Sequence, residues 1–231
     1  ATTDDGKPTV AGAALTVADL AEKWEATLEG VYPTHASEKP EEMPNMDYDR
    51  RLLTVVKNRV ARPKAVIPVF PGTNCEYDTA NACIRAGIDP EILVIRNLTT
   101  DLLSQSAQAL EAAISQAQMI VLPGGFSGGD EPEGSGKFIA SFFRNPRIKD
   151  AVHEMLKQRD GLMLGICNGF QALIKLGLVP YGEIRDMDDS CPTLTFNLIG
   201  RHQSRYCDIR VASVLSPWML KAQVGDVYTV P

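Results

Sequence analysis

The sequence lacks the features that mark nucleic-acid-binding, membrane-spanning and secreted proteins. Its 231 residues carry a formal net charge of −6, without the clustered lysines and arginines that bind nucleic acid or an anionic membrane. No apolar run reaches the roughly 20 residues needed to cross a bilayer. The first ten residues form no signal segment. We therefore expect neither nucleic acid nor a membrane as a partner.

Cysteine and histidine are scarce, which limits disulfide and metal chemistry. The cysteines are odd in number and irregular in spacing, and lie at positions 75, 83, 167, 191 and 207. This spacing fits neither a disulfide framework nor a paired zinc knuckle. We therefore predict a reducing, cytoplasmic location and no metal site. The histidines are His35, His153 and His202.

The pattern of the first 62 residues differs from that of residues 63–231. Apolar residues recur at helical spacing over 15–28, with Thr16 or Asp19 as the N-cap. Prolines and charges then dominate residues 35–50, as in a linker, and a short helix is expected over 48–60. The sequence thus predicts a linker region (1–62) and one domain (63–231), which looks incomplete at its C-terminus because the chain stops directly after an expected strand.

From residue 64, short apolar strands alternate with amphipathic helices. The strands are expected at 65–70, 91–97, 118–125 and 161–166. Gly87 and Gly177 are typical residues to end two of the intervening helices. A third helix gathers its apolar residues on one face, namely Ile148, Val152, Met155 and Leu156. The alternation predicts an α/β fold with a mostly parallel sheet and helices on both faces. Beyond Leu178, hairpins or a mixed extension are expected at 193–199, 206–214 and 226–230.

Three loops are expected at the carboxyl edge of this sheet, where doubly wound folds bind ligands. They are PGTNCEYD (71–78), PGGFSGGDEPEGSG (123–136) and GICNGFQ (165–171). The third contains G-x-C-x-G between a strand and a helix, the cysteine form of the nucleophile elbow. Gly165 and Gly169 would allow a close backbone approach, and the helix N-terminus would favour a thiolate at Cys167. The alternative is that Cys167 is a small buried residue.

The other two loops are less specific. Glycines at 124–129 could supply a second oxyanion donor, cradle a phosphate or form an ordinary turn, although their spacing is not that of a phosphate loop. Residues 71–78 contain one glycine, which excludes a dinucleotide fingerprint. Cys75 is interpreted as a helix-start or buried residue.

A general base for Cys167 is not evident. His35 lies in the linker region. His153 lies on a helix that leads to the amino end of the Cys167 strand, and is interpreted as a solvated residue far from the elbow. His202 lies in a plausible loop without an obvious acid partner. The sequence therefore predicts a nucleophile whose base is missing.

Together, GICNGFQ, PGGFSGGD and FPGTNCEYD resemble the class I (triad) glutamine amidotransferases, and more narrowly the glutaminase domain of phosphoribosylformylglycinamidine synthases, over residues 64–231. The resemblance implies a flavodoxin-like three-layer fold in which Cys167 attacks the side-chain amide of glutamine. It implies an oxyanion hole from the N–H groups at Gly125 and Asn168. Residues implied to lie near glutamine are Phe126 and Gln171, with Ser204 and Tyr206 as further candidates.

The resemblance also implies a partner. Residues 20–34 look like the tail of a synthetase part, which favours the form of these enzymes in which synthetase and glutaminase share one chain. ATP and magnesium would bind that synthetase part, and no cofactor is expected in residues 63–231. In the family, the catalytic histidine and glutamate that complete the triad lie beyond a strand such as 226–230. We therefore expect this chain to be inactive alone. The rival interpretations are another cysteine-elbow hydrolase of related fold and a non-catalytic α/β regulatory module.

Overall fold

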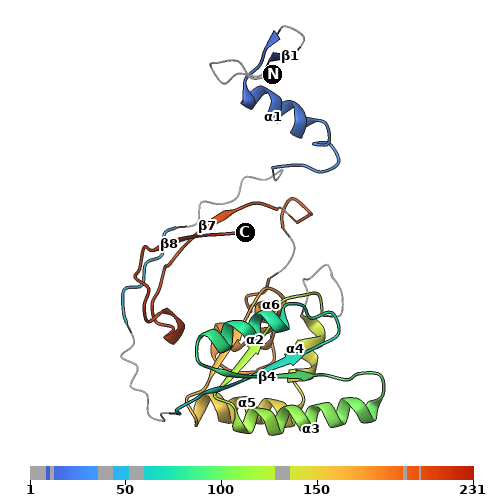
Figure 1. Cartoon of the computed structure of the whole chain (residues 1–231), viewed down its shortest axis with the longest axis vertical. Helices are drawn as coiled ribbons and strands as arrows, with labels where there is room; N and C mark the ends of the chain where they lie inside the picture. Colours follow the sequence, from blue (N-terminus) through green and yellow to red (C-terminus); the bar gives the residue numbers. More distant parts are fainter. Residues whose placement is uncertain are drawn as a thin grey trace. The chain divides into compact units, whose positions relative to one another are not determined.

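A computed structural model describes residues 9–10, 13–35, 44–51, 60–127, 136–194, 197–202 and 204–231. The chain forms two compact units, Ala1–Thr54 with Phe196–Pro231, and Val55–Thr195 (Figure 1). The boundary predicted at residue 62 remains a prediction. Most of the helix expected over 48–60 lies outside the described residues.

The unit Val55–Thr195 is built on a four-stranded parallel sheet. Its strands are β3 (Lys64–Val69), β4 (Asp89–Val94), β5 (Met119–Leu122) and β6 (Leu162–Gly165). They lie side by side in the order β4-β3-β5-β6, and each neighbouring pair is parallel. Numbered along the chain this order is 2-1-3-4, as in the flavodoxin-like class of doubly wound sheets. The predicted α/β fold with a parallel sheet is confirmed.

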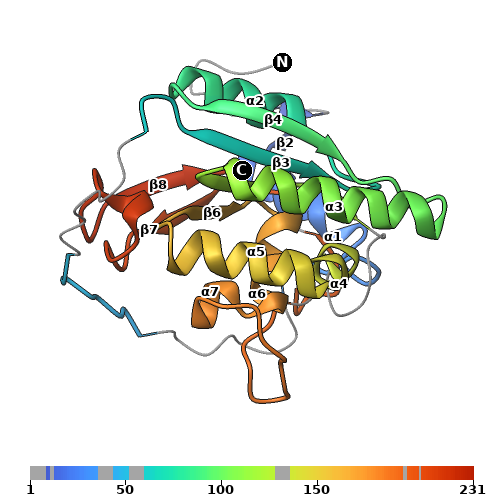
Figure 2. The same cartoon turned by 90° about the horizontal axis from the view of Figure 1, so that it is seen from below.

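Helices cover both faces of this sheet. On one face, Ala80 and Cys83 of α2 (Glu76–Arg85) pack near Ile67 and Val121 of the sheet. The opposite face carries a larger core, in which Val66 and Ile120 pack with residues of the remaining helices. Figure 2 shows these helices on the side of the sheet opposite to α2. These helices are α3 (Thr100–Gln116), α4 (Lys137–Phe143), α5 (Pro146–Lys157) and α6 (Asn168–Leu176). The result is the three-layer arrangement that the sequence predicted.

The predicted helix ends and the predicted apolar face agree with the structure. Gly87 follows α2 and Gly177 ends α6, with positive φ angles of 81° and 86° that favour glycine. Ile148, Val152 and Met155 of α5 are all fully buried. Helix α4 was not predicted, and a short helix α7 (Leu178–Tyr181) also follows Gly177.

The other unit contains short elements. Strands β1 (Thr9–Val10) and β2 (Ala13–Ala14) precede α1 (Val17–Ala26), where Thr16 and Asp19 form a reciprocal capping box. The expected hairpin is confirmed, because β7 (Cys207–Arg210) pairs antiparallel with β8 (Val227–Val230), and a single 3₁₀ turn, η1 (Pro217–Met219), lies between them. Residues 193–194 and 197–199, expected as strand, form none. None of the helices in the described ranges is both long and apolar enough to cross a membrane.

Candidate functional site

Cys167 occupies a sharp turn between β6 and α6. Before it, the Ile166 N–H donates to the Leu122 carbonyl at 3.0 Å, which continues the sheet. After it, the Gln171 N–H donates to the Cys167 carbonyl at 3.0 Å, which begins the helix. Cys167 itself has φ 51° and ψ −106°, a conformation that is strained for any residue with a side chain. Its side chain is exposed and its thiol is free, as a strand–turn–helix nucleophile requires.

The two glycines beside Cys167 allow backbones to touch. A Cβ atom on Gly165 would lie 2.7 Å from the carbonyl carbon of Gly169. A Cβ atom on Gly169 would lie 2.2 Å from the carbonyl oxygen of Leu122. Neither distance is sterically possible, so the close approach expected at both glycines is confirmed.

Two of the predicted edge loops are joined by backbone hydrogen bonds. The Phe126 N–H donates to the Gly72 carbonyl at 2.8 Å, and the Asn74 N–H donates to the Gly124 carbonyl at 2.9 Å. Thr73 and Gly125 are the residue pair between these bonds. Thr73 and Gly125 are therefore a non-hydrogen-bonded pair, and in such a pair the N–H of Gly125 points away from Thr73.

The same loop touches the elbow. A Cβ atom on Gly124 would lie 3.5 Å from the Cβ atom of Cys167. Gly125 has φ 122°, and a Cβ atom there would lie 2.3 Å from the Gly72 carbonyl oxygen, so only glycine fits. Asn168 is the first residue of α6, at the helix end where backbone N–H groups lack acceptors from a preceding turn. The structure thus brings the Gly124–Gly125 loop, Cys167 and the start of α6 together.

A buried side-chain contact ties the loop to the helix. The Asn168 Oδ1 atom accepts a hydrogen bond from the Ser127 hydroxyl at 2.7 Å and one from the Ser127 N–H at 3.3 Å. The Asn168 Nδ2 group donates to Gln171 Oε1 at 3.4 Å. Asn168 and Ser127 are each only 1% exposed. Sequence reasoning missed Ser127 and the Asn168 side chain, because no local pattern links residues 41 positions apart.

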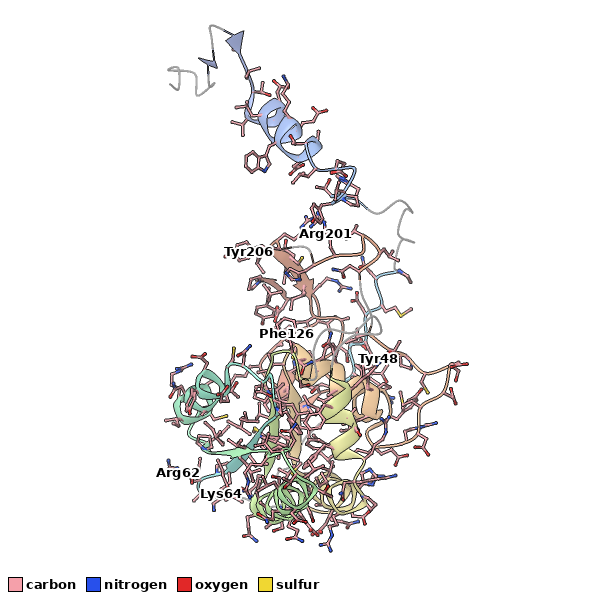
Figure 3. All side chains as sticks on the ribbon, turned by 90° about the vertical axis from the view of Figure 1, so that its right-hand side faces the viewer. Tyr48, Arg62, Lys64, Phe126, Arg201 and Tyr206 are labelled. Atoms are coloured by element: carbon pink, nitrogen blue, oxygen red, sulfur yellow. The ribbon has the colours of Figure 1, made fainter. Side chains whose placement is uncertain are left out.

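The residues expected near a substrate have different positions. Phe126 is 56% exposed and lies at the opposite end of its unit from Arg62 and Lys64, which mark the start of β3 (Figure 3). Gln171 is half-buried beside Asn168. Ser204 and Tyr206 belong to the other compact unit, so their predicted contact with glutamine remains a prediction.

His153 is occupied by a structural role. It is half-buried on α5, and its Nε2 atom accepts a hydrogen bond from the Ile184 N–H at 2.9 Å. Burial lowers the pKa of His153, and the nearby Lys157 and Lys149 lower it further. The prediction that His153 is a solvated histidine is therefore wrong.

Two further details complete the site. Cys75 is the N-cap residue directly before α2, with a positive φ of 66°, which confirms the helix-start interpretation, and its side chain is exposed rather than buried. Within the part of the chain that the structure describes, no three His, Cys, Asp or Glu side chains are grouped to hold a metal ion. The arrangement offers an exposed thiol beside backbone N–H groups, which suits acyl transfer through a thioester.

Comparisons with known proteins agree with this chemistry. Residues 62–231 match the CobB/CobQ-like glutamine amidotransferase domain. The phosphoribosylformylglycinamidine synthase subunit PurQ of Dehalococcoides mccartyi is 33% identical over 152 residues, which cover 66% of this chain and 54% of that protein. The PurQ subunit of Aquifex aeolicus is 33% identical over 171 residues, which cover 73% and 61%.

A solved structure, that of PurLQS from Thermotoga maritima, is 30% identical, with a TM-score of 0.35 and coverage of 51% of this chain and 45% of that chain. The chain spans between half and two thirds of the length of the two PurQ relatives.

Proposed function

Because the chain belongs to the CobB/CobQ-like glutamine amidotransferase domain family, we propose that Cys167 releases ammonia from the side-chain amide of glutamine. The observation that carries this proposal is the strained turn that exposes the Cys167 thiol beside the Gly124–Gly125 loop. A thiol in this position can attack a carbonyl carbon while neighbouring N–H groups receive the developing oxyanion.

The proposed reaction has two stages. The Cys167 thiolate bonds to the amide carbon of glutamine, and the carbonyl electron pair moves to oxygen, where the N–H groups of Gly125 and Asn168 donate. The carbon–nitrogen bond then breaks, the nitrogen takes a proton, and ammonia leaves a γ-glutamyl thioester. Water adds to the thioester, the carbon–sulfur bond breaks, and glutamate and the free thiol are formed. Phe126 and Gln171 would contact glutamine, with Ser204 and Tyr206 at its amino-acid end.

The thiol proton must go to a base. His153 is the only histidine between residues 55 and 195, and its Nε2 atom is occupied by the Ile184 N–H. We therefore propose that a histidine held by a glutamate, from outside residues 55–195, serves Cys167.

The ammonia requires an acceptor. The names of the PurQ relatives support phosphoribosylformylglycinamidine synthase as the assembly. We propose that a synthetase domain of the same polypeptide, with ATP and magnesium, uses the ammonia to convert formylglycinamide ribonucleotide to its amidine. The five free cysteines support a reducing compartment, the cytoplasm.

The decisive experiment measures glutamate and amidine formation by the full-length protein supplied with formylglycinamide ribonucleotide and MgATP. Cys167→Ala should lower glutamine-dependent amidine formation by at least about 10³-fold, because the nucleophile is lost. The same variant should keep the activity with ammonium chloride, because the synthetase is untouched. Cys191→Ala, at a cysteine outside the three edge loops, is the matched control and should behave as wild type. Normal glutamine use by Cys167→Ala would contradict the proposal.

The single-chain arrangement has its own test. Peptides from residues 64–85 and peptides of the synthetase should come from one gel band of the native protein. Two separate bands would show that the synthetase is a separate subunit.

A further inference from the structure

We propose that the side chain of Asn168 is a positioning residue, which holds the loop carrying the Gly125 N–H against the Cys167 elbow through Ser127. The proposal rests on the proposed glutaminase chemistry and adds a role that the backbone of Asn168 alone does not have. It assigns the buried Ser127 hydroxyl to the same function.

The orientation of the Asn168 carboxamide is set by its neighbours. The Ser127 backbone N–H can only donate, so the Asn168 atom that faces it must be Oδ1. The NH₂ group of Asn168 then faces Gln171, which must present its Oε1 atom. The hydrogen bonds therefore have one possible direction: Ser127 donates to Asn168, and Asn168 donates to Gln171.

The contact joins the two segments that would form the oxyanion hole. Ser127 lies two residues after Gly125, and Asn168 directly follows Cys167. The loop is also held from its other side, because the Gly72 carbonyl and the Asn74 N–H bond to Phe126 and Gly124. Asn168 therefore adds a side-chain tie between the loop and the elbow to this backbone pairing.

Burial makes the contact strong. Both side chains are 1% exposed, so water cannot readily replace a lost hydrogen bond between them. The loop would then move to reach another donor or acceptor. A donor displaced by about 1 Å can lower the rate by about 10²-fold.

The effect should appear in kcat rather than in KM. The Gly125 N–H donates to charge that develops on the amide oxygen only when Cys167 attacks. Moving this N–H therefore weakens the binding of the transition state more than the binding of glutamine. A loss of folded protein would also lower the apparent kcat and leave KM unchanged, so the two roles are separated by the alkylation of Cys167 described below.

The test compares Ser127→Thr with Ser127→Val in the full-length protein. The two side chains have the same shape, and only threonine keeps a hydroxyl that can donate to Asn168. Ser127→Val should lower kcat for glutamine hydrolysis by about tenfold, the effect of a partly displaced donor, while KM stays within twofold. Ser127→Thr should recover most of the loss. Asn168→Leu, which removes both contacts, should lower kcat by about 10²-fold.

A second readout separates positioning from damage to the elbow. Iodoacetamide alkylates Cys167 by displacing iodide from carbon, so no oxyanion forms. Peptide mapping should show the same alkylation rate at Cys167 in Ser127→Val and in wild type. Ser106→Ala, at another buried serine whose hydroxyl donates to a backbone carbonyl, is the control for losing a buried hydroxyl and should keep wild-type kcat.

The outcomes distinguish this proposal from the proposed function. If wild-type protein does not hydrolyse glutamine, the proposed function fails. If wild type is active and Ser127→Val has the same kcat, or loses kcat and alkylation together, the positioning role of Asn168 is overturned while the glutaminase assignment stands.

Discussion

Gly169 and Leu122 meet backbone to backbone, since a Cβ atom on Gly169 would lie 2.2 Å from the Leu122 carbonyl oxygen. This contact joins the first turn of α6 to the end of β5, and it holds Cys167 at the carboxyl edge of the sheet. An added methyl group has no room unless the helix moves.

We therefore expect Gly169→Ala to lower the free energy of unfolding by at least about 2 kcal/mol, because it forces overlap with a backbone atom that cannot rotate away. Urea denaturation followed by far-ultraviolet circular dichroism measures the change. Gly30→Ala is the control, because a Cβ atom there meets nothing within 4 Å, and it should change the free energy by less than about 0.5 kcal/mol. Equal stability of the two variants would refute the packing account.

Arg159 gives a prediction about the end of a helix. Its guanidinium donates to the carbonyls of Ala117 and Ile114 at 2.8 and 2.7 Å, where α3 ends. Lysine cannot reproduce two diverging donors, so Arg159→Lys should cost about 1–2 kcal/mol. Arg147→Lys, which changes an exposed ion pair with Glu111, should cost less than about 0.5 kcal/mol. Thermal denaturation of both variants decides, and a larger loss for Arg147→Lys would contradict the expectation.

His153 predicts a pH dependence of stability. Burial and the nearby lysines lower its pKa in the folded protein below the usual value of 6.5, so the unfolded chain binds the proton more readily. Stability from this group is fully present above pH 6.5 and is lost as the pH falls through 6.5 toward the folded pKa. The free energy of unfolding should therefore decrease between pH 7.5 and pH 5.

The matched variant is His153→Gln, which can still accept from the Ile184 N–H but does not titrate. Its decrease over the same range should be smaller. Glu183 does not confound this window, since its pKa is lowered by Lys157 from 4.5 and its contribution changes only at lower pH. A parallel decrease in both proteins would show that His153 is not the cause.

The cysteines predict an order of thiol modification. Cys83 is 7% exposed and burial raises the pKa of its thiol, whereas Cys167 and Cys207 are exposed. N-ethylmaleimide should modify the exposed pair in the native protein and Cys83 only when urea unfolds the chain. Peptide mass mapping with time measures the order. Modification of Cys83 as fast as that of Cys207 in native protein would show that the α2 core opens freely.

The parts of the fold that sequence reasoning predicted depend on short-range patterns. Gly87 and Gly177 lie at helix ends because glycine readily adopts the left-handed conformation that is needed there. Ile148, Val152 and Met155 face the core because their spacing places them on one side of the helix. Cys167 was identified as an elbow from five adjacent residues, and its turn has the conformation that such a motif implies.

The missed parts depend on contacts between distant residues or on environment. Helix α4 contains Phe138, Ile139, Phe142 and Phe143, whose side chains favour strands, and it is stabilised by packing against Phe70 and its neighbours. The bonds from Asn168 to Ser127 join two segments that the fold alone brings together. The role of His153 as an acceptor could not be predicted, because its donor is the backbone N–H of Ile184, which lies 31 positions away, after α7.

The backbone conformation of Cys167 implies that stability and catalysis favour different residues at this position. Glycine would adopt φ 51° and ψ −106° with little strain, so Cys167→Gly should raise the melting temperature of the protein while removing its nucleophile. A mutant library selected only for survival of heat should therefore accumulate glycine at this codon. Retention of cysteine there under such selection would require a second, activity-based screen.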